Sequence, residues 1–285
     1  MAIDDQGTHY GNLQSYKFYM LPTAKKLYGT STSHVKHHQN VQQLLHVLAL
    51  LGTSTTWEMA KKRFPNDNSR VREKEKEYRR LLIGRTDRGR HSSGVLDFGL
   101  VVKDGQVQRY PVSDKYRLSL HGILYCLNVL NLNQNDVDLI ARNYSTVIPK
   151  IFGKWDLLKS LIGDDVYKLR ILSKGLLLDN TLIVKAKNNP LYELMSYIHV
   201  KYRRYFESIS EEYLADQISL WFYTYFLYDS DSDKTSKQTP SGIKKLLRVL
   251  KHDSELQDWY LKFVNESGKY YQERVDTIRS SGLIK

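Results

Sequence analysis

The stretch Val41–Phe64 constrains the fold most, because it encodes two helices joined by a short turn. In the first helix, apolar residues recur at spacings of three and four, which places them on one face: Val41, Leu44, Leu45 and Leu48. Gly52 is well placed to end that helix. Thr55 and Glu58 have the spacing of a capping box that opens the second helix, and Pro65 interrupts it. Two short helices joined by a Gly-Thr-Ser turn are the opening of a helix-turn-helix.

A third helix is expected at about Ser69–Ile83. Glu75 and Arg79 form a favourable pair four residues apart on it. Its apolar stripe is thin and consists of Val71, Tyr78 and Leu82. Most of the surface of this helix must therefore face water or a charged partner.

The next segment carries strand signals. Leu100, Val101 and Val102 lead into Asp104-Gly105, a dipeptide that is the strongest short signal for a hairpin turn. We therefore expect a return strand at Val107–Tyr110, ended by Pro111. A further short strand is expected at Lys115–Leu118.

The rest of the chain is nearly all helical in pattern. Ser119 can cap a helix with apolar positions at Leu120, Ile123, Leu124, Leu127 and Leu130. The clearest loop is Asp229–Gly242. Seven further helices are expected after Leu132, at Asp136–Val147, Pro149–Leu161, Asp165–Leu178, Leu191–Ser208, Glu211–Tyr228, Ser241–Lys251 and Glu255–Ser281.

Composition limits the classes of protein that fit. Among 285 residues, 41% are hydrophobic and 26% are charged, which is the balance of a globular chain. Cys126 is the single cysteine, so no disulfide scaffold can form, and we expect a buried thiol. The N-terminal residues do not resemble a signal peptide, and the longest apolar stretch, Tyr213–Tyr228, is shorter than the roughly 20 residues of a membrane-spanning helix. We expect a soluble, cytoplasmic protein with no membrane partner.

The positive charge is concentrated in one part of the chain. The net charge is +12, and residues 61–90 carry 12 basic against 5 acidic side chains. A focused basic patch suits a polyanion binder, because neutralising phosphates releases counterions. A solvated helix face and attraction to an anionic membrane surface are the alternative explanations.

The order helix, helix, helix, hairpin, strand, helix carries a family resemblance. The run FGLVVKDG … KYRLSLHG, with Gly99-Leu100-Val101 and Tyr116–Gly122, resembles the wing region of winged helix-turn-helix regulators, most closely archaeal and bacterial transcription regulators. The resemblance covers residues 41–131. It implies a mainly α fold with a small β-hairpin wing and a winged-helix DNA-binding domain at 41–131. The polar, mixed composition of residues 1–40 predicts a partly ordered arm, and the helical pattern that follows predicts an all-α domain at 132–285.

The position of the recognition helix is open. The gap between the second helix and Gly99 is longer than one recognition helix requires. Either Ser69–Ile83 is the recognition helix and a basic loop is inserted after it, or recognition belongs to about Thr86–Phe98. Gly89 and Gly94 weaken a helix in the second segment by about 1 kcal/mol each relative to Ala.

Basic and hydroxyl side chains in these segments and on the wing are the candidate DNA contacts. Arginines can read guanine bidentately, whereas lysines mostly meet phosphate. The alternative is a set of solubilising charges and intrahelical salt bridges. The candidates are Lys61, Lys62, Arg63, Arg70, Arg72, Lys74, Arg79, Arg80, Arg85, Arg88, Arg90, His91, Ser92, Ser93, Lys103, Arg109 and Lys115.

Two other clusters favour ordinary explanations. Four histidines lie close together, at His34, His37, His38 and His46. A polar linker is favoured over a metal site, because no cysteine is nearby and no carboxylate lies between them. Asp229, Asp231 and Asp233 resemble the start of an EF-hand loop, but Lys234 and Pro240 occupy its required Gly and Glu positions, which favours a solvated acidic loop.

The aromatic run Trp221–Phe226 is apolar all round, which is typical of a central core helix; a ligand pocket or dimer interface is the alternative. Phosphate-loop, dinucleotide, nucleophile-elbow and zinc-protease patterns are absent from the sequence. We therefore expect no metal, no cofactor and no catalysis.

The leading hypothesis is a DNA-binding transcriptional regulator with double-stranded DNA as its partner. The helical half would then serve homodimerisation, partner contact or sensing. The alternatives are a protein-interaction module of a transcription or assembly complex, and an RNA-binding protein.

Overall fold

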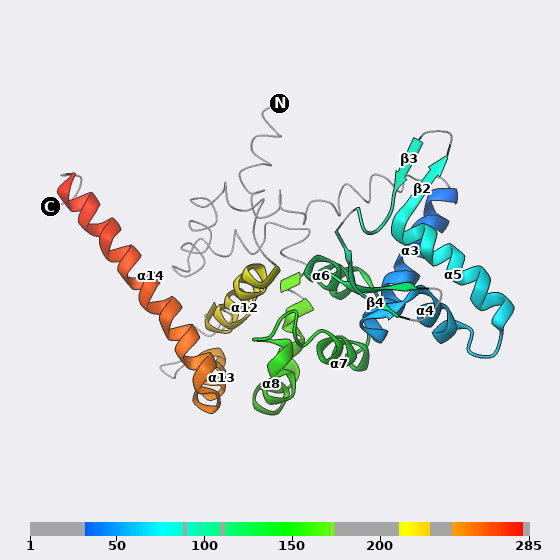
Figure 1. Ribbon diagram of the computed structural model, residues 1–285. Helices are drawn as coiled ribbons and strands as arrows, with labels where there is room; N and C mark the ends of the chain where they lie inside the picture. Colours follow the sequence, from blue (N-terminus) through cyan, green and yellow to red (C-terminus); the bar gives the residue numbers. More distant parts are fainter. Residues whose placement is uncertain are drawn as a thin grey trace.

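The computed structural model describes residues 32–87, 90–97, 99–108, 112–170, 172–173, 211–228 and 241–281. The expectations for residues 1–31, for the helix Leu191–Ser208 and for the acidic residues 229–240 lie outside these ranges, as do Arg88 and Arg109. In the described part, three helices and two hairpins form the N-terminal half, and further helices form the C-terminal half (Figure 1).

The first helices form where the apolar pattern places them. The helices are α3 (Thr32–Leu51), α4 (Thr56–Arg63) and α5 (Asn68–Ile83). Gly52 ends α3 with a φ of 73° and donates its N–H to the carbonyl of Leu48. The capping box is confirmed, since the backbone N–H of Thr55 and that of Glu58 each donate to the other residue's side chain. The first helix begins nine residues before Val41, within the segment expected to be an arm.

A three-stranded antiparallel sheet lies beside these helices. Its order is β1-β5-β4, formed by β1 (Ser54–Thr55), β5 (Ser113–Leu118) and β4 (Val101–Val107). The expected strand at Lys115–Leu118 is therefore confirmed within β5. The two-residue strand β1, which joins α3 to α4, was not expected, because Ser54 and Thr55 read in the sequence only as a turn and a helix cap.

The expected hairpin turn at Asp104-Gly105 is wrong. Both residues lie inside β4, where the register shifts between Lys103 and Gln106. Two residues of β4 there face one residue of β5, which makes a β-bulge with Gly105 at a φ of 89°. Glycine supplies the positive φ that both a bulge and a hairpin turn need, so the dipeptide alone does not distinguish them. Val107 consequently ends β4 and does not begin a return strand.

The second alternative for the recognition helix is also wrong. A separate two-stranded ribbon replaces the expected helix at Thr86–Phe98; its strands are β2 (Gly84–Asp87) and β3 (Arg90–Ser93). In the register, Arg85 is opposite Ser92 and Thr86 is opposite His91. The ribbon follows α5 directly, so it takes the place of the inserted basic loop of the first alternative.

The C-terminal half is helical in its described residues. Glu211–Tyr228 has the bounds expected from the sequence. The expected helix Pro149–Leu161 is replaced by turns, a 3-10 turn and then α8. The elements are α6 (Leu120–Val129), α7 (Gln134–Asn143), η2 (Phe152–Lys154), α8 (Trp155–Ile162), η3 (Gly163–Lys168), α12 (Glu211–Tyr228), α13 (Ser241–His252) and α14 (Ser254–Ser280).

Tyr144 explains why α7 ends before the expected Val147. It is the residue that closes α7, and its side chain is buried. Its hydroxyl donates to the carbonyl of Leu48 over 2.8 Å and accepts the backbone N–H of Leu118 over 3.3 Å. One side chain thus joins α7 to α3 and β5, and the hydrophobic core continues from one half of the molecule into the other.

The core contains the residues that the sequence assigned to it. Cys126 is a buried free thiol, and burial raises its pKa. Trp221, Phe222 and Tyr223 are buried in α12, which confirms this part of the aromatic run as core. Among the described residues, no helix combines the length and apolar character needed to cross a lipid bilayer.

Candidate nucleic-acid interface

Helix α5 is fixed to the core by one narrow face. Val71, Tyr78 and Leu82 are fully buried on it. The carboxylate of Asp67 caps the helix by accepting the backbone N–H of Arg70 over 3.0 Å. Because a helix repeats every 3.6 residues, this apolar stripe leaves the opposite side of α5 facing outward.

The outward side of α5 carries a row of exposed cations. Arg72, Lys76 and Arg80 follow one another at intervals of four residues, and all three are exposed. These three side chains are called the open row. Within the residues that the structure describes, none of the three makes an ion pair or a hydrogen bond through its side chain. Lys76 was not among the sequence-based candidates; its spacing from Arg72 and Arg80 is the signal that identifies it.

The other cations of α5 are paired within the helix or its cap. Arg70 lies 3.3 Å from Asp67, and Lys74 lies 2.7 Å from Glu77. The ammonium of Lys74 also lies 5.1 Å from the centre of the Tyr78 ring, so this side chain is only 12% exposed. Arg70 and Lys74 are therefore held away from the open row.

The third pair orders the contact between α4 and α5. A guanidinium nitrogen of Arg79 lies 2.7 Å from Glu75, and the same carboxylate oxygen accepts the hydroxyl of Thr56 over 2.9 Å. Arg79 remains 62% exposed. It therefore lies beside the open row while one of its nitrogens is bound.

Helix α4 adds two more exposed cations. Lys61 and Lys62 are exposed, and their side chains make no ion pair or hydrogen bond in the described part of the chain. Arg63 instead donates to the side-chain carbonyl of Gln43 over 2.8 Å. Trp57 lies on the same helix and is 41% exposed.

The outer part of the β4–β5 hairpin, beyond the pair Lys103 and Tyr116, has its own polar network. The ammonium of Lys103 lies 2.7 Å from the carboxylate of Asp114, which also accepts the amide of Gln106. These hydrogen bonds hold the pKa of Asp114 below its ordinary value. Lys103 is therefore engaged within the hairpin, and neighbouring Lys115 is half-buried.

The hairpin is tied to the helical half through Arg117 on β5. Its guanidinium donates to the carboxylate of Glu211, the first residue of α12, over 2.8 Å. The same carboxylate accepts the backbone N–H of Leu120 at the start of α6 over 2.7 Å. Glu211 thus fixes the relative position of β5, α6 and α12.

The structure brings some sequence candidates together and not others. Arg72 and Arg80 share one open face, and Lys61 and Lys62 lie on the adjoining helix. Arg63, Arg70, Lys74, Arg79 and Lys103 have intramolecular partners. The backbone of the ribbon is described, but the side chains of its candidates lie outside the description: Arg85, Arg90, His91, Ser92 and Ser93.

The histidine cluster lies in a helix. His34, His37, His38 and His46 all belong to α3, so the expected polar linker is wrong. The first three side chains lie outside the described part. Within that part, no group of three His, Cys, Asp or Glu residues is arranged to hold a metal ion.

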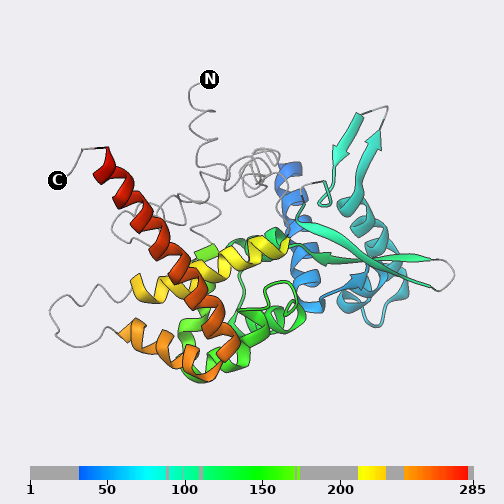
Figure 2. The same ribbon diagram turned by 60° about the vertical axis from the view of Figure 1, so that its left-hand side comes forward.

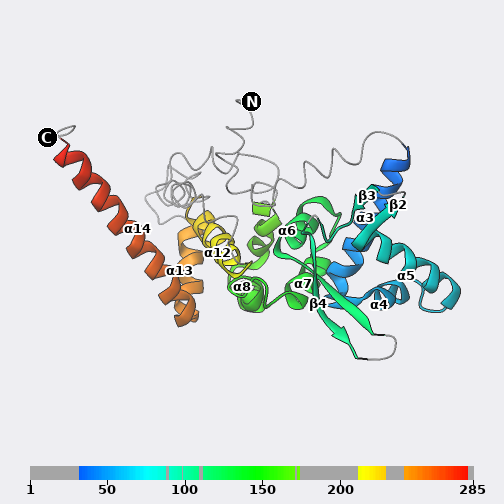
Figure 3. The same cartoon turned by 45° about the horizontal axis from the view of Figure 1, so that its top comes forward.

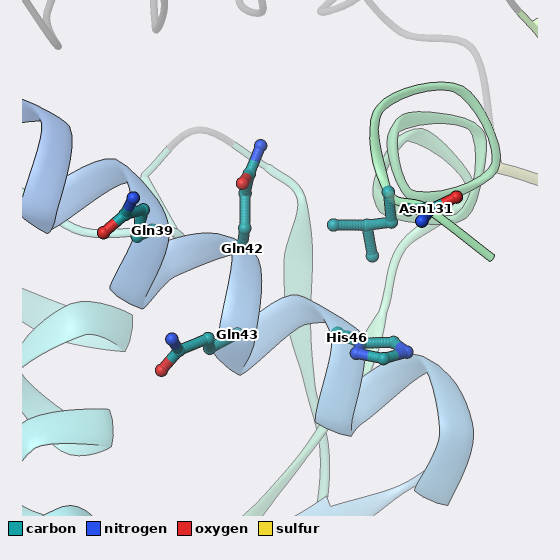
Figure 4. Close-up of a pocket in the computed structure, with 6 residues that line it drawn as sticks. Gln39, Gln42, Gln43, His46 and Asn131 are labelled. Atoms are coloured by element: carbon teal, nitrogen blue, oxygen red, sulfur yellow. The ribbon is translucent and has the colours of Figure 1, made fainter.

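A pocket of about 470 Å³ opens between α3 and the segment after α6, and Figure 4 shows His46 on α3 facing Asn131. Its lining has amides, one imidazole and one leucine but no Lys, Arg, Asp or Glu side chain, so it offers hydrogen bonds to a polar group. The lining residues are Gln39, Gln42, Gln43, His46, Leu130 and Asn131.

Comparison of the chain with protein-family models, with curated proteins and with solved structures finds no match. The geometry of α4, α5 and the two hairpins is therefore the basis on which function is inferred.

Proposed function

We propose that this chain is a DNA-binding protein of the winged helix-turn-helix type, in which α5 enters the major groove of duplex DNA. The element order α3, β1, α4, α5, β4, β5 and the sheet order β1-β5-β4 support this assignment. In it, α4 and α5 form the helix-turn-helix, and the β4–β5 hairpin is the wing.

The open row on α5 is the observation that carries the proposal. Eight residues separate Arg72 from Arg80, which corresponds to roughly 12 Å along the helix. The major groove is about 12 Å wide and accepts an α-helix, which is about 10–12 Å across with its side chains. The row therefore offers three cations to a single stretch of groove. Within the described residues, these cations have no intramolecular ion pair that DNA would need to displace.

The two kinds of cation have different roles in this proposal. Arg72 and Arg80 can donate two parallel hydrogen bonds to guanine, whereas Lys76 neutralises phosphate as a point charge. Lys61 and Lys62 meet the phosphate backbone beside the groove. The paired residues Arg70 and Lys74 position α5 and contribute little to binding.

The test compares two triple variants of equal charge change. R72A/K76A/R80A removes the open row, and K244A/K251A/K262A removes three exposed lysines of α13 and α14 as the matched control. At about 1 kcal/mol or more per contact, the first variant should bind duplex DNA at least about 100-fold more weakly in low salt. The control should bind like the wild type, and both variants should unfold at the wild-type temperature.

Equal duplex affinity for the wild type and R72A/K76A/R80A would contradict the proposal. A mixed-sequence duplex measures the phosphate contribution, and competition with structured RNA distinguishes the two nucleic acids. Preference for the RNA competitor would assign the same face to RNA.

A protein-interaction module is the second candidate, because two large apolar side chains are exposed on the same helices. Trp57 on α4 is 41% exposed and Ile83 at the end of α5 is 48% exposed. Exposed Trp side chains are enriched at protein interfaces. Capture of a stable protein partner that W57A/I83A loses and R72A/K76A/R80A retains would favour this candidate.

A further inference from the structure

The β2–β3 ribbon begins at the residue that ends α5. Gly84 closes the helix with a φ of 86°, and its N–H donates to the carbonyl of Arg80. A positive φ of this size favours glycine, since a Cβ would strain the backbone. Strand β2 therefore leaves α5 without an intervening loop.

The return strand is fixed to the same helix end. A Cβ added at Gly94 would lie 2.2 Å from the carbonyl oxygen of Leu82 and 2.4 Å from the nitrogen of Gly84. The chain can cross the last turn of α5 at this point only because Gly94 has no side chain. Asp97 then accepts the N–H of Gly94 over 2.8 Å, and Val95 is buried.

Backbone hydrogen bonds complete this joint. The N–H of Val95 donates to the carbonyl of Leu81 over 2.9 Å, and that of Leu96 donates to the carbonyl of Leu82 over 3.1 Å. These are carbonyls of the last turn of α5, which a helix leaves without intrahelical partners. The ribbon is therefore joined to α5 through both of its strands, so its direction relative to the helix is set by the fold.

The ribbon has no apolar surface of its own to bury. Residues 84–93 read GRTDRGRHSS, with three arginines, one histidine and one acidic residue. Within the described part of the chain, β2 and β3 pair only with each other, and they extend away from the helices (Figures 1 and 2). A two-stranded hairpin is at best marginally stable in water by itself. This polar, basic ribbon therefore suits an anionic partner rather than the hydrophobic core.

We propose that the β2–β3 ribbon is a second DNA-contacting element, which reaches phosphates of the duplex beyond the stretch of groove that α5 occupies. The proposal rests on the DNA-binding function proposed for α5. Four residues per strand extend about 13 Å. That length corresponds to roughly four base pairs at 3.4 Å per pair along the helix axis.

The β4–β5 hairpin is a separate element. It leaves the same half of the molecule in another direction, as Figure 3 shows. Its basic residue Lys103 is paired with Asp114. The ribbon is thus the hairpin that continues the chain of α5 itself, and it carries more basic than acidic residues.

Two variants test the ribbon. In the first, residues 86–91 are replaced by an Asn-Gly turn, which joins the register partners Arg85 and Ser92 and leaves Gly94 intact. This removes two of the four residue pairs of the ribbon, so the protected stretch of duplex should shorten by roughly two base pairs at one end. In the second, R85A/R90A, affinity in low salt should fall about 10-fold, and the fall of log affinity with log salt should become less steep by about two.

The control is K244A/K251A, which removes the same charge from α13 and should leave the protected length and affinity unchanged. Wild-type protection by both ribbon variants, together with loss of binding by R72A/K76A/R80A, would overturn the ribbon proposal and leave the function of α5 standing. Loss of protection only in the ribbon variants would make the ribbon the main DNA contact and would contradict both the role of α5 and the ribbon's role as a second element beside it. Absence of duplex binding by the wild type would overturn both proposals.

Discussion

The cations of α5 and those of the helical half differ in where their partners lie. On α5, Lys74 pairs with Glu77 and Arg79 with Glu75, within one or two turns of the same helix. In the helical half, one pair is local, Lys168 with Asp165, but four pairs join different parts of the fold: Lys150 with Asp216, Lys154 with Asp253, Lys159 with Asp138, and Lys245 with Asp165. Ion pairs therefore join separate parts of the fold in the helical half. On α5 the ion pairs are local, and the open row has no ion pair within the described residues.

The carboxylate of Asp138, in the helical half, accepts hydrogen bonds from three side chains. Its carboxylate accepts Trp155 Nε1 over 2.8 Å, Lys159 Nζ over 2.6 Å and the hydroxyl of Tyr167 over 3.0 Å. No carboxylate of α5 gathers three donors in the described structure. The difference implies that charge removal should affect stability in the helical half and ligand binding on α5.

The largest effect on stability is expected at Trp155. Its side chain is 2% exposed and makes edge contacts with Phe152 and Tyr167. W155A should lower the free energy of unfolding by about 3–5 kcal/mol, because it leaves a cavity and removes a donor to Asp138. Urea unfolding measures this, with W57A at an exposed site as the control, expected within about 0.5 kcal/mol of wild type. Unchanged duplex affinity of folded W155A would show that this site in the helical half affects stability and not DNA binding.

Acid should weaken the helical half through Asp138. Burial opposes ionisation of this carboxyl, but hydrogen bonds from Lys159, Trp155 and Tyr167 outweigh it and lower the pKa. A lowered folded-state pKa gives stability above the unfolded pKa of about 3.9, and this stability is lost as pH falls through the folded pKa.

D138N measures that contribution directly. It should cost about 1.5 kcal/mol at pH 7 and less as pH falls below about 4, because the wild type then loses the same charge. Urea unfolding from pH 7 to pH 3 provides the test. If the variant and the wild type differ in free energy of unfolding by the same amount over this pH range, the charge of Asp138 does not contribute to stability.

The capping box of α4 should have a smaller effect. Thr55 Oγ1 accepts the N–H of Glu58 over 3.2 Å. T55A should cost about 1 kcal/mol of unfolding free energy, and T55S, which keeps the hydroxyl, should recover most of it. Equal stability of T55A and T55S would show that the cap does not hold α4 in place.

The smallest effect on stability is expected for the pair on the surface of α5. R79A removes a partner of Glu75 at an exposed site and should change the free energy of unfolding by about 0.5 kcal/mol or less. K159A removes the cation of an ion pair between two helices. It should lower the free energy of unfolding by more than R79A does, because it removes one of three donors to Asp138. A larger loss of unfolding free energy for R79A than for K159A, measured by urea unfolding, would contradict the difference described between the two regions.

Local signals in the sequence predict several of the helices. The apolar spacing after Val41, the capping pair Thr55 and Glu58, and the cap at Ser119 all specify their elements through neighbouring residues, and the structure confirms them. Glu211–Tyr228 is confirmed for the same reason, since its apolar run has no competing turn signal.

Features set by distant contacts were not predictable. Strand β1 exists because Ser54 and Thr55 pair with Tyr116 and Lys115, which follow some sixty residues later in the chain. Gly105 has the φ of a turn residue, but pairing on both sides of it makes a bulge. The ribbon has no alternation of apolar residues to indicate a strand, and it depends on the bonds that Val95 and Leu96 make to α5.

The candidate site was predictable in part. The charge concentration in residues 61–90 indicates a basic surface, but the sequence alone does not separate paired cations from open ones. Lys74 and Arg72 are two residues apart, yet one packs over Tyr78 and the other is exposed. That difference depends on which side of α5 faces the core.

The salt dependence of duplex binding tests the central claim most directly. Because Lys76 is assigned to phosphate whereas Arg72 and Arg80 are assigned to guanine, the plot of log affinity against log salt should be less steep by about 0.9 in R72A/K76A/R80A than in the wild type. The slope of K244A/K251A/K262A should equal that of the wild type. Identical slopes for the wild type and R72A/K76A/R80A would contradict the assignment of this face of α5 to DNA.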